Sequence, residues 1–127
     1  MKTEVVFTMD TSSIKYGSGA TREIGYEMKQ LGAGRVMVLT DPNLADTEPV
    51  NVVMSALRAE GIDAVLFDRV RVEPTDLSLK EAIKFAVDGH FNGYIAVGGG
   101  STMDTAKAAN LYATYPAEFL TYVKDKI

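Results

Sequence analysis

One stretch of this chain constrains its fold more than any other: a short apolar run that leads through three glycines into the start of a helix. The stretch extends from Gly93 to Lys107, and its apolar part, which ends at Val97, suits a strand buried on both faces of a parallel sheet. Glycines 98–100 allow a sharp turn and a close approach of the backbone to a ligand. Ser101 is the expected N-cap, with Asp104 three residues later as in a capping box. The free N–H groups of this helix start favour an anion, and phosphate is the natural candidate.

The glycine run allows two interpretations. The sequence Gly-Gly-Gly-Ser is also typical of a flexible connection between a strand and a helix. Its position favours a binding role, because the carboxyl ends of buried parallel strands are where open α/β sheets bind their ligands. The run matches neither G-x-G-x-x-G nor G-x-x-x-x-G-K-[ST], so no standard phosphate-binding motif identifies the ligand.

The rest of the chain predicts an α/β domain. Three apolar runs, Arg35–Leu39, Ala64–Phe67 and Tyr94–Val97, are separated by roughly 20 to 25 residues, enough for helical crossovers, which are right-handed almost without exception. Residues 4–9 and 13–16 predict a β-hairpin at the edge of the sheet. Residues 1–127 are therefore expected to form a single Rossmann-like, doubly wound domain with a mostly parallel sheet. The expected helices and their apolar positions are about 20–31 (Ala20, Ile24, Met28, Leu31), 47–61 (Val50, Val53, Met54, Leu57), a third ending at Gly89 (Leu79, Ile83, Ala86, Val87), and a fourth from Ser101 to Pro116.

Composition excludes several classes of function. The chain has 13 basic and 17 acidic side chains, a net charge of −4, and no basic cluster, which argues against nucleic acid and anionic membranes as partners. It has no cysteine, and His90 is its only histidine, so we expect no metal site within these residues. No apolar signal peptide or membrane span is present in the sequence, from which we expect a cytoplasmic protein.

Asp41 follows the first of the three parallel strands. An Asp before a Pro is common in turns, and this structural role explains the residue without any ligand. Alternatively, an acidic side chain at this end of a dinucleotide-binding sheet accepts the 2′-hydroxyl of the adenosine ribose. The second interpretation predicts NAD rather than NADP as the ligand.

Two motifs resemble those of a known family. The segment from Gly98 to Lys107, GGGSTMDTAK, resembles the signature of the iron-containing alcohol dehydrogenases, and Leu39 to Leu44, LTDPNL, resembles the family's earlier cofactor turn. Nearly the whole chain shares this resemblance. Residues 70–76 and 101–113 are most similar to the hydroxyacid-oxoacid transhydrogenase branch. This sequence has Glu73, which matches that branch, where many other members have Asn.

The resemblance implies a fold, a cofactor and site residues. The family has a dinucleotide-binding domain followed by a helical domain that holds a divalent metal, iron or zinc, through one Asp and three His. We expect that helical metal domain to be absent from these 127 residues. The resemblance implies that Gly99, Gly100 and Ser101 hold the pyrophosphate of NAD, that Asp104 lies near the nicotinamide, and that Asp41 binds the adenosine ribose. It implies no catalytic residue and no metal ligand in this chain.

The resemblance also implies a function, with alternatives. The chain is expected to be the NAD-binding part of a metal-dependent dehydrogenase acting on alcohols or hydroxyacids, and to be inactive alone. One alternative is a fragment of a transhydrogenase acting on 4-hydroxybutyrate and 2-oxoglutarate, and another is a nucleotide-binding module without catalysis. We also expect the apolar edge hairpin to be covered by a second copy in a homodimer or by the missing carboxyl-terminal domain.

Overall fold

The computed structural model describes residues 5–8, 14–16 and 23–115 of the chain. These residues form one five-stranded sheet in the order β2-β1-β5-β3-β4. Strands β3 (Arg35–Leu39), β4 (Asp63–Phe67) and β5 (Gly93–Val97) are parallel, and β3 pairs with both of the others. The expected hairpin is confirmed: β1 (Val5–Thr8) and β2 (Ile14–Tyr16) pair antiparallel, and β1 joins the sheet beside β5.

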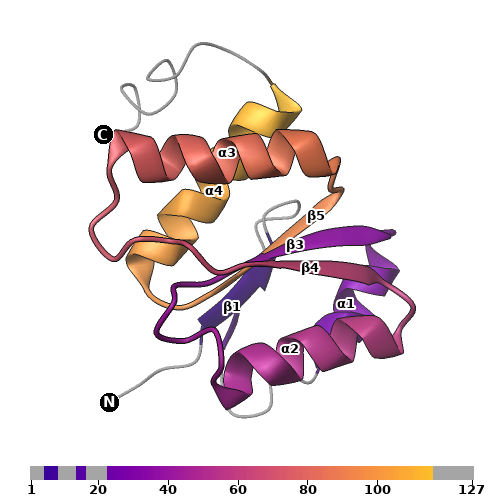
Figure 1. Cartoon of the computed structure of the whole chain (residues 1–127). Coiled ribbons are helices and arrows are strands. Elements are labelled where there is room, and N and C mark those ends of the chain that lie inside the picture. The colour runs from indigo at the N-terminus through magenta and orange to yellow at the C-terminus, as the bar shows by residue number, and fades with distance from the viewer. Residues whose placement is uncertain (1–4, 9–13, 17–22, 116–127) are drawn as a thin grey trace.

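The helices cover both faces of the sheet, as in other doubly wound folds. Figure 1 shows α1 (Ile24–Gln30) and α2 (Glu48–Ala59) on one face, and α3 (Asp76–Gly89) and α4 (Gly100–Thr114) on the other. Two apolar cores result, one between the sheet and the α1/α2 layer and one between the sheet and the α3/α4 layer. The α/β prediction is thereby confirmed.

The predicted apolar face is confirmed for α2 and is wrong in part for two other helices. All four apolar positions expected in α2, Val50 among them, are buried. In α1, Leu31 is 47% exposed because the helix ends at Gln30, and Ala20 lies outside the described residues. In α3, Val87 is 45% exposed and the buried positions are Ala82 and Ala86.

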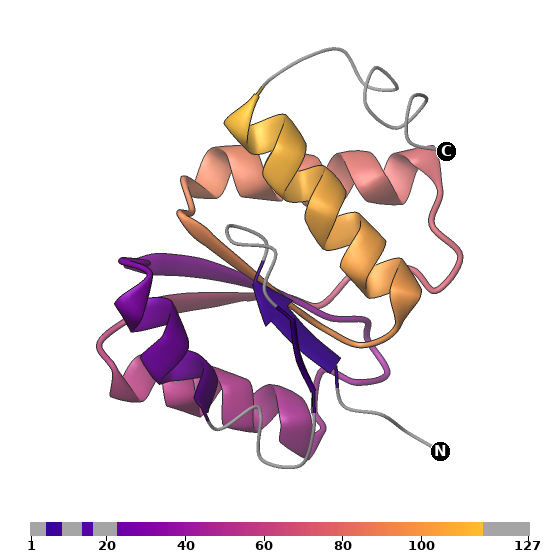
Figure 2. The same cartoon turned by 180° about the vertical axis from the view of Figure 1, so that it is seen from behind.

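Small side chains explain the buried face of α3. Ala82 and Ala86 share one core cluster with Ala106 and Ala109 of α4, and the view from behind shows α4 running across α3 on the same face of the sheet (Figure 2). Two helices approach closely where the side chains between them are short. This crossing selects the alanines of α3 for the core and turns Val87 outward.

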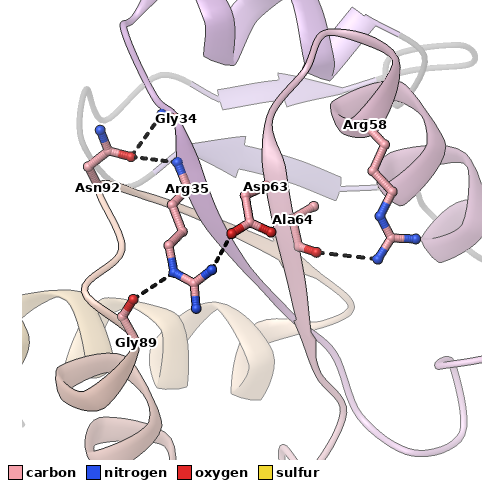
Figure 3. A network of polar contacts seen from close by, with 7 residues as sticks. All are labelled: Gly34, Arg35, Arg58, Asp63, Ala64, Gly89 and Asn92. Atoms are coloured by element: carbon pink, nitrogen blue, oxygen red, sulfur yellow. Dashed lines mark hydrogen bonds and ion pairs between the residues drawn. The ribbon is translucent and has the colours of Figure 1, made fainter.

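A polar network fixes the strand register at the amino end of the sheet (Figure 3). Asn92 accepts hydrogen bonds through Oδ1 from the backbone amides of Gly34 and Arg35, both at 3.0 Å. The Arg35 guanidinium donates to the carbonyl oxygen of Gly89 at 2.7 Å and is paired with Asp63. The network joins β3, β4 and the turn before β5, and therefore holds the parallel strands in one alignment.

Candidate functional site

The glycine run lies where β5 ends and α4 begins. Gly98 has a φ of 151°, a conformation that side chains rarely adopt, and a Cβ there would lie 2.7 Å from Oγ1 of Thr102. The prediction that Ser101 caps the helix is wrong: α4 begins at Gly100, Gly99 is its N-cap, and no side chain donates or accepts a capping hydrogen bond. The turn at Gly98 starts the helix earlier than the Ser101 pattern indicates, and Asp104 therefore lies beyond the capping-box position.

Two of the three glycines leave open space at the helix start. A Cβ built on Gly99 or Gly100 meets nothing within 4 Å, and both residues are exposed. Packing inside the domain therefore does not require glycine at either position. The missing side chains leave the first N–H groups of a 15-residue helix accessible to a ligand.

A buried hydroxyl beside the loop has no partner. Thr102 is 1% exposed, and its Oγ1 makes no hydrogen bond among the described residues. The same oxygen is the nearest atom to the position that a Cβ on Gly98 would take. Buried polar atoms usually make hydrogen bonds, so the Thr102 hydroxyl is an exception among the described residues.

Asp41 has a structural role that uses one of its carboxylate oxygens. The side chain is 9% exposed, and Oδ1 accepts hydrogen bonds from the amides of Asn43 at 2.8 Å and Leu44 at 3.0 Å. The turn interpretation is thus confirmed. The other oxygen makes no hydrogen bond within the described residues, which leaves it for a ligand, and its role toward a ribose stays a prediction.

Thr40, which no sequence pattern singled out, lies where the ends of β3 and β5 are adjacent. It is fully buried, and its Oγ1 donates to the carbonyl oxygen of Val97 at 2.8 Å. Because Leu39 pairs with Ala96, the chain leaves β3 at Asp41 directly beside the point where it leaves β5. A threonine at the end of a strand carries no local signal of this role, since its partner is 57 residues away.

The remaining candidates occupy different positions. Ser101 is half-buried, and its carbonyl oxygen accepts a hydrogen bond from Oγ1 of Thr105 at 2.8 Å. Asp104 is exposed further along α4. His90 is exposed at the carboxyl end of α3, and hence at the opposite end of the sheet, which β5 enters a few residues later. In the part of the chain that the structure describes, no three His, Cys, Asp or Glu side chains lie close enough together to hold a metal ion.

Comparisons with known proteins identify the family of the chain. The family model described as iron-containing alcohol dehydrogenase matches residues 11–127, and the chain belongs to that family. It is 52% identical over 126 residues to the mitochondrial hydroxyacid-oxoacid transhydrogenases of Rattus norvegicus and Homo sapiens. These matches cover 98% of this chain and 27% of each relative, so the chain spans about a quarter of their length.

Solved structures give the same family. A 1,3-propanediol oxidoreductase superposes with a TM-score of 0.75 and 26% identity, over 84% of this chain and 28% of that chain. An NADH-dependent butanol dehydrogenase from Thermotoga maritima superposes with a TM-score of 0.71 and 29% identity, over 82% of this chain and 26% of that chain. The family and these relatives are oxidoreductases, which confirms the resemblance found in the sequence.

The comparisons correct one expectation. The expected cytoplasmic location is contradicted by the transhydrogenase relatives, whose names place them in mitochondria. The expectation was based on the absence of an apolar signal peptide, but mitochondrial transit peptides are amphipathic and have no such core. Among the described helices, none is both long and apolar enough to cross a membrane.

Proposed function

We propose that residues 1–127 form the NAD-binding domain of a metal-dependent oxidoreductase that transfers hydride between a hydroxyacid or alcohol and NAD. The observation that carries this proposal is the accessible, side-chain-free start of α4 directly beside Asp41. The start of α4 offers backbone N–H donors for a pyrophosphate, and Asp41 offers a carboxylate oxygen for a ribose hydroxyl. The two chemical groups are adjacent in a dinucleotide.

The residues present fit this cofactor. Space that a Cβ would fill is empty at both Gly99 and Gly100, so phosphate oxygens can reach the backbone amides there. The amides of Asn43 and Leu44 hold one carboxylate oxygen of Asp41, and these hydrogen bonds fix the orientation of the other oxygen. A carboxylate at this position disfavours a 2′-phosphate, and we therefore propose NAD rather than NADP.

The nicotinamide of bound NAD accepts or donates the hydride in such enzymes, and the protein supplies binding and orientation. Within this chain, the helix start would fix the pyrophosphate, Asp41 would fix the adenosine ribose, and Asp104, on the exposed side of α4, would lie toward the nicotinamide half. A divalent metal, iron or zinc, would be held by residues outside this chain, where it would polarise the substrate oxygen. We propose that the chain by itself binds NAD without turnover.

The transhydrogenase reaction is the more specific proposal, because the relatives with this name are 52% identical over nearly the whole chain. In such a reaction a hydroxyacid is oxidised while an oxoacid is reduced, and the bound dinucleotide carries the hydride between them. A simple dehydrogenase would release NADH to solution. An assay with 4-hydroxybutyrate and 2-oxoglutarate, with and without free NAD, distinguishes the two reactions in the protein as the gene encodes it.

The binding proposal is tested by Gly100→Val, with Gly34→Val as the matched control. A Cβ meets nothing within 4 Å at either glycine, but Gly34 lies at the opposite end of the sheet. Both variants should fold, as judged by circular dichroism. In a fluorescence titration with NADH, Gly100→Val should weaken binding at least tenfold because the valine occupies the pyrophosphate position.

The control should bind NADH as the unmodified protein does. Equal binding by Gly100→Val and Gly34→Val would show that the glycine run is only a connection. Undetectable binding of NADH by the unmodified protein would reject the proposed function itself.

A further inference from the structure

We propose that Thr40 is a positioning residue that sets the separation between the two halves of the dinucleotide site. The inference rests on the proposed function, since it concerns how that site is assembled. Thr40 is fully buried and directly follows β3, the strand that lies between β5 and β4 in the sheet. It therefore acts on a ligand only through the elements to which it bonds.

Three hydrogen bonds place Thr40 at this junction. Its amide donates to the carbonyl oxygen of Phe67, the last residue of β4, at 2.9 Å. Its own carbonyl oxygen accepts from the amide of Val70 at 3.2 Å. Its hydroxyl donates to the carbonyl oxygen of Val97, the last residue of β5, at 2.8 Å.

The hydroxyl bond of Thr40 lies just beyond the paired part of β3 and β5. Pairing of β3 with β5 stops at Leu39 and Ala96. Beyond these paired residues, the bond from the Thr40 hydroxyl to the carbonyl oxygen of Val97 ties the residue that follows β3 to the last residue of β5. The residues that follow Thr40 and Val97 are Asp41 and Gly98, where the proposed ribose-binding and pyrophosphate-binding parts of the site begin.

The ligand makes this separation important. A dinucleotide has a fixed distance between its adenosine ribose and its pyrophosphate, so the carboxylate and the helix amides must be held at a matching distance before binding. Any freedom between the two strand ends must be lost on binding, which weakens affinity. A ligand that contacts only one element does not depend on the separation. The proposal therefore predicts that loss of the hydroxyl weakens linked ligands and leaves half-ligands unaffected.

The test compares Thr40→Val with Thr40→Ser in the protein as the gene encodes it, whether 127 residues or longer. Valine keeps the shape of threonine without the donor, and serine keeps the donor. Calorimetric titration should give a dissociation constant for NAD that rises roughly tenfold in Thr40→Val and stays within about twofold in Thr40→Ser. Thr114→Val is the control, because it removes a hydroxyl at the far end of α4 whose 3.1 Å bond to Asn110 lies within that helix. It should leave the dissociation constant unchanged.

Ligands that carry only one of the two groups, adenosine or pyrophosphate, distinguish a positioning role of Thr40 from a general loss of structure. Ligand-observed NMR titrations should show that adenosine and inorganic pyrophosphate bind Thr40→Val and the unmodified protein equally, while ADP, which links the two groups, binds the variant more weakly. Proportional weakening of all three probes would overturn the positioning role in favour of a purely structural one. If Thr40→Val does not fold, Thr40→Ala removes the same donor without added bulk and takes its place.

The outcomes also separate this inference from the proposed function. If the unmodified protein binds NAD and Thr40→Val binds it equally well, the positioning role is wrong and the dinucleotide site stands. If the unmodified protein binds neither NAD nor ADP, both proposals are wrong.

Discussion

The carboxylate of Asp41 can be tested by a substitution that separates its two roles. In Asp41→Asn the side-chain amide oxygen can still accept from the amides of Asn43 and Leu44, so the turn after β3 is kept. The second carboxylate oxygen becomes an NH₂ group, which donates and cannot accept a hydrogen bond from a ribose hydroxyl. The variant therefore removes the proposed ligand contact while it preserves the local fold.

The expected magnitude follows from these contacts. A hydrogen bond to a charged group contributes about 1.5–3 kcal/mol, which corresponds to a loss of roughly 10- to 100-fold in NAD affinity. The turn exchanges two charge-assisted hydrogen bonds for neutral ones, so the free energy of unfolding should fall by no more than about 1 kcal/mol. Removing the negative charge also removes repulsion of a 2′-phosphate, and the preference for NAD over NADP should largely disappear.

The assay is calorimetric titration with both dinucleotides, combined with urea denaturation of each protein. Asp46→Asn is the control, because Asp46 is an exposed residue of the same loop and its substitution changes the net charge equally. The control should keep the affinity and the preference of the unmodified protein. Unchanged NAD affinity and unchanged discrimination in Asp41→Asn would refute the ribose role and leave Asp41 as a turn residue only.

Two further predictions concern stability. Gly25→Ala should lower the free energy of unfolding by about 1–3 kcal/mol in urea denaturation, because a Cβ there would lie 2.1 Å from the backbone oxygen of Ala56 in α2. This steric cost exceeds the gain from the higher helix propensity of alanine. A stabilised variant would contradict the close crossing of α1 and α2. Asn92→Ala should cost about 1–2 kcal/mol in the same measurement, because two backbone amides at the start of β3 lose their acceptor (Figure 3). Asn92→Asp, which keeps an acceptor oxygen, should recover most of this loss, and equal losses in both variants would count against the role of Oδ1.

The local sequence was sufficient to predict the elements and the likeness to a family. Apolar runs such as Arg35–Leu39 are strands, the helix from Glu48 to Ala59 has the expected buried face, and the glycine run leads from a strand into a helix. These features depend on residues near one another along the chain, where apolar periodicity and turn chemistry act directly. The turn role of Asp41, one of the two interpretations that the sequence allowed, is local in the same way.

The predictions that failed depend on packing between distant segments. The predicted face of α3 was wrong in part: Ala86 is buried as expected, but contact with α4 also buries Ala82 and leaves Val87 exposed. The predicted N-cap of α4 was Ser101, but the observed N-cap is Gly99. The backbone conformation at Gly98 decides where the first helical turn begins. Neither outcome is encoded in the spacing of apolar residues within one helix.

The assembly of the site divides in the same way. The sequence by itself determined the chemical groups: glycines that expose backbone amides, and a carboxylate at the end of a strand. Only the tertiary structure decided that β5 lies beside β3, and that Thr40 reaches Val97 across 57 residues of chain to join the two strand ends. Strand order and long-range hydrogen bonds depend on how whole layers pack, and no local pattern carries that information.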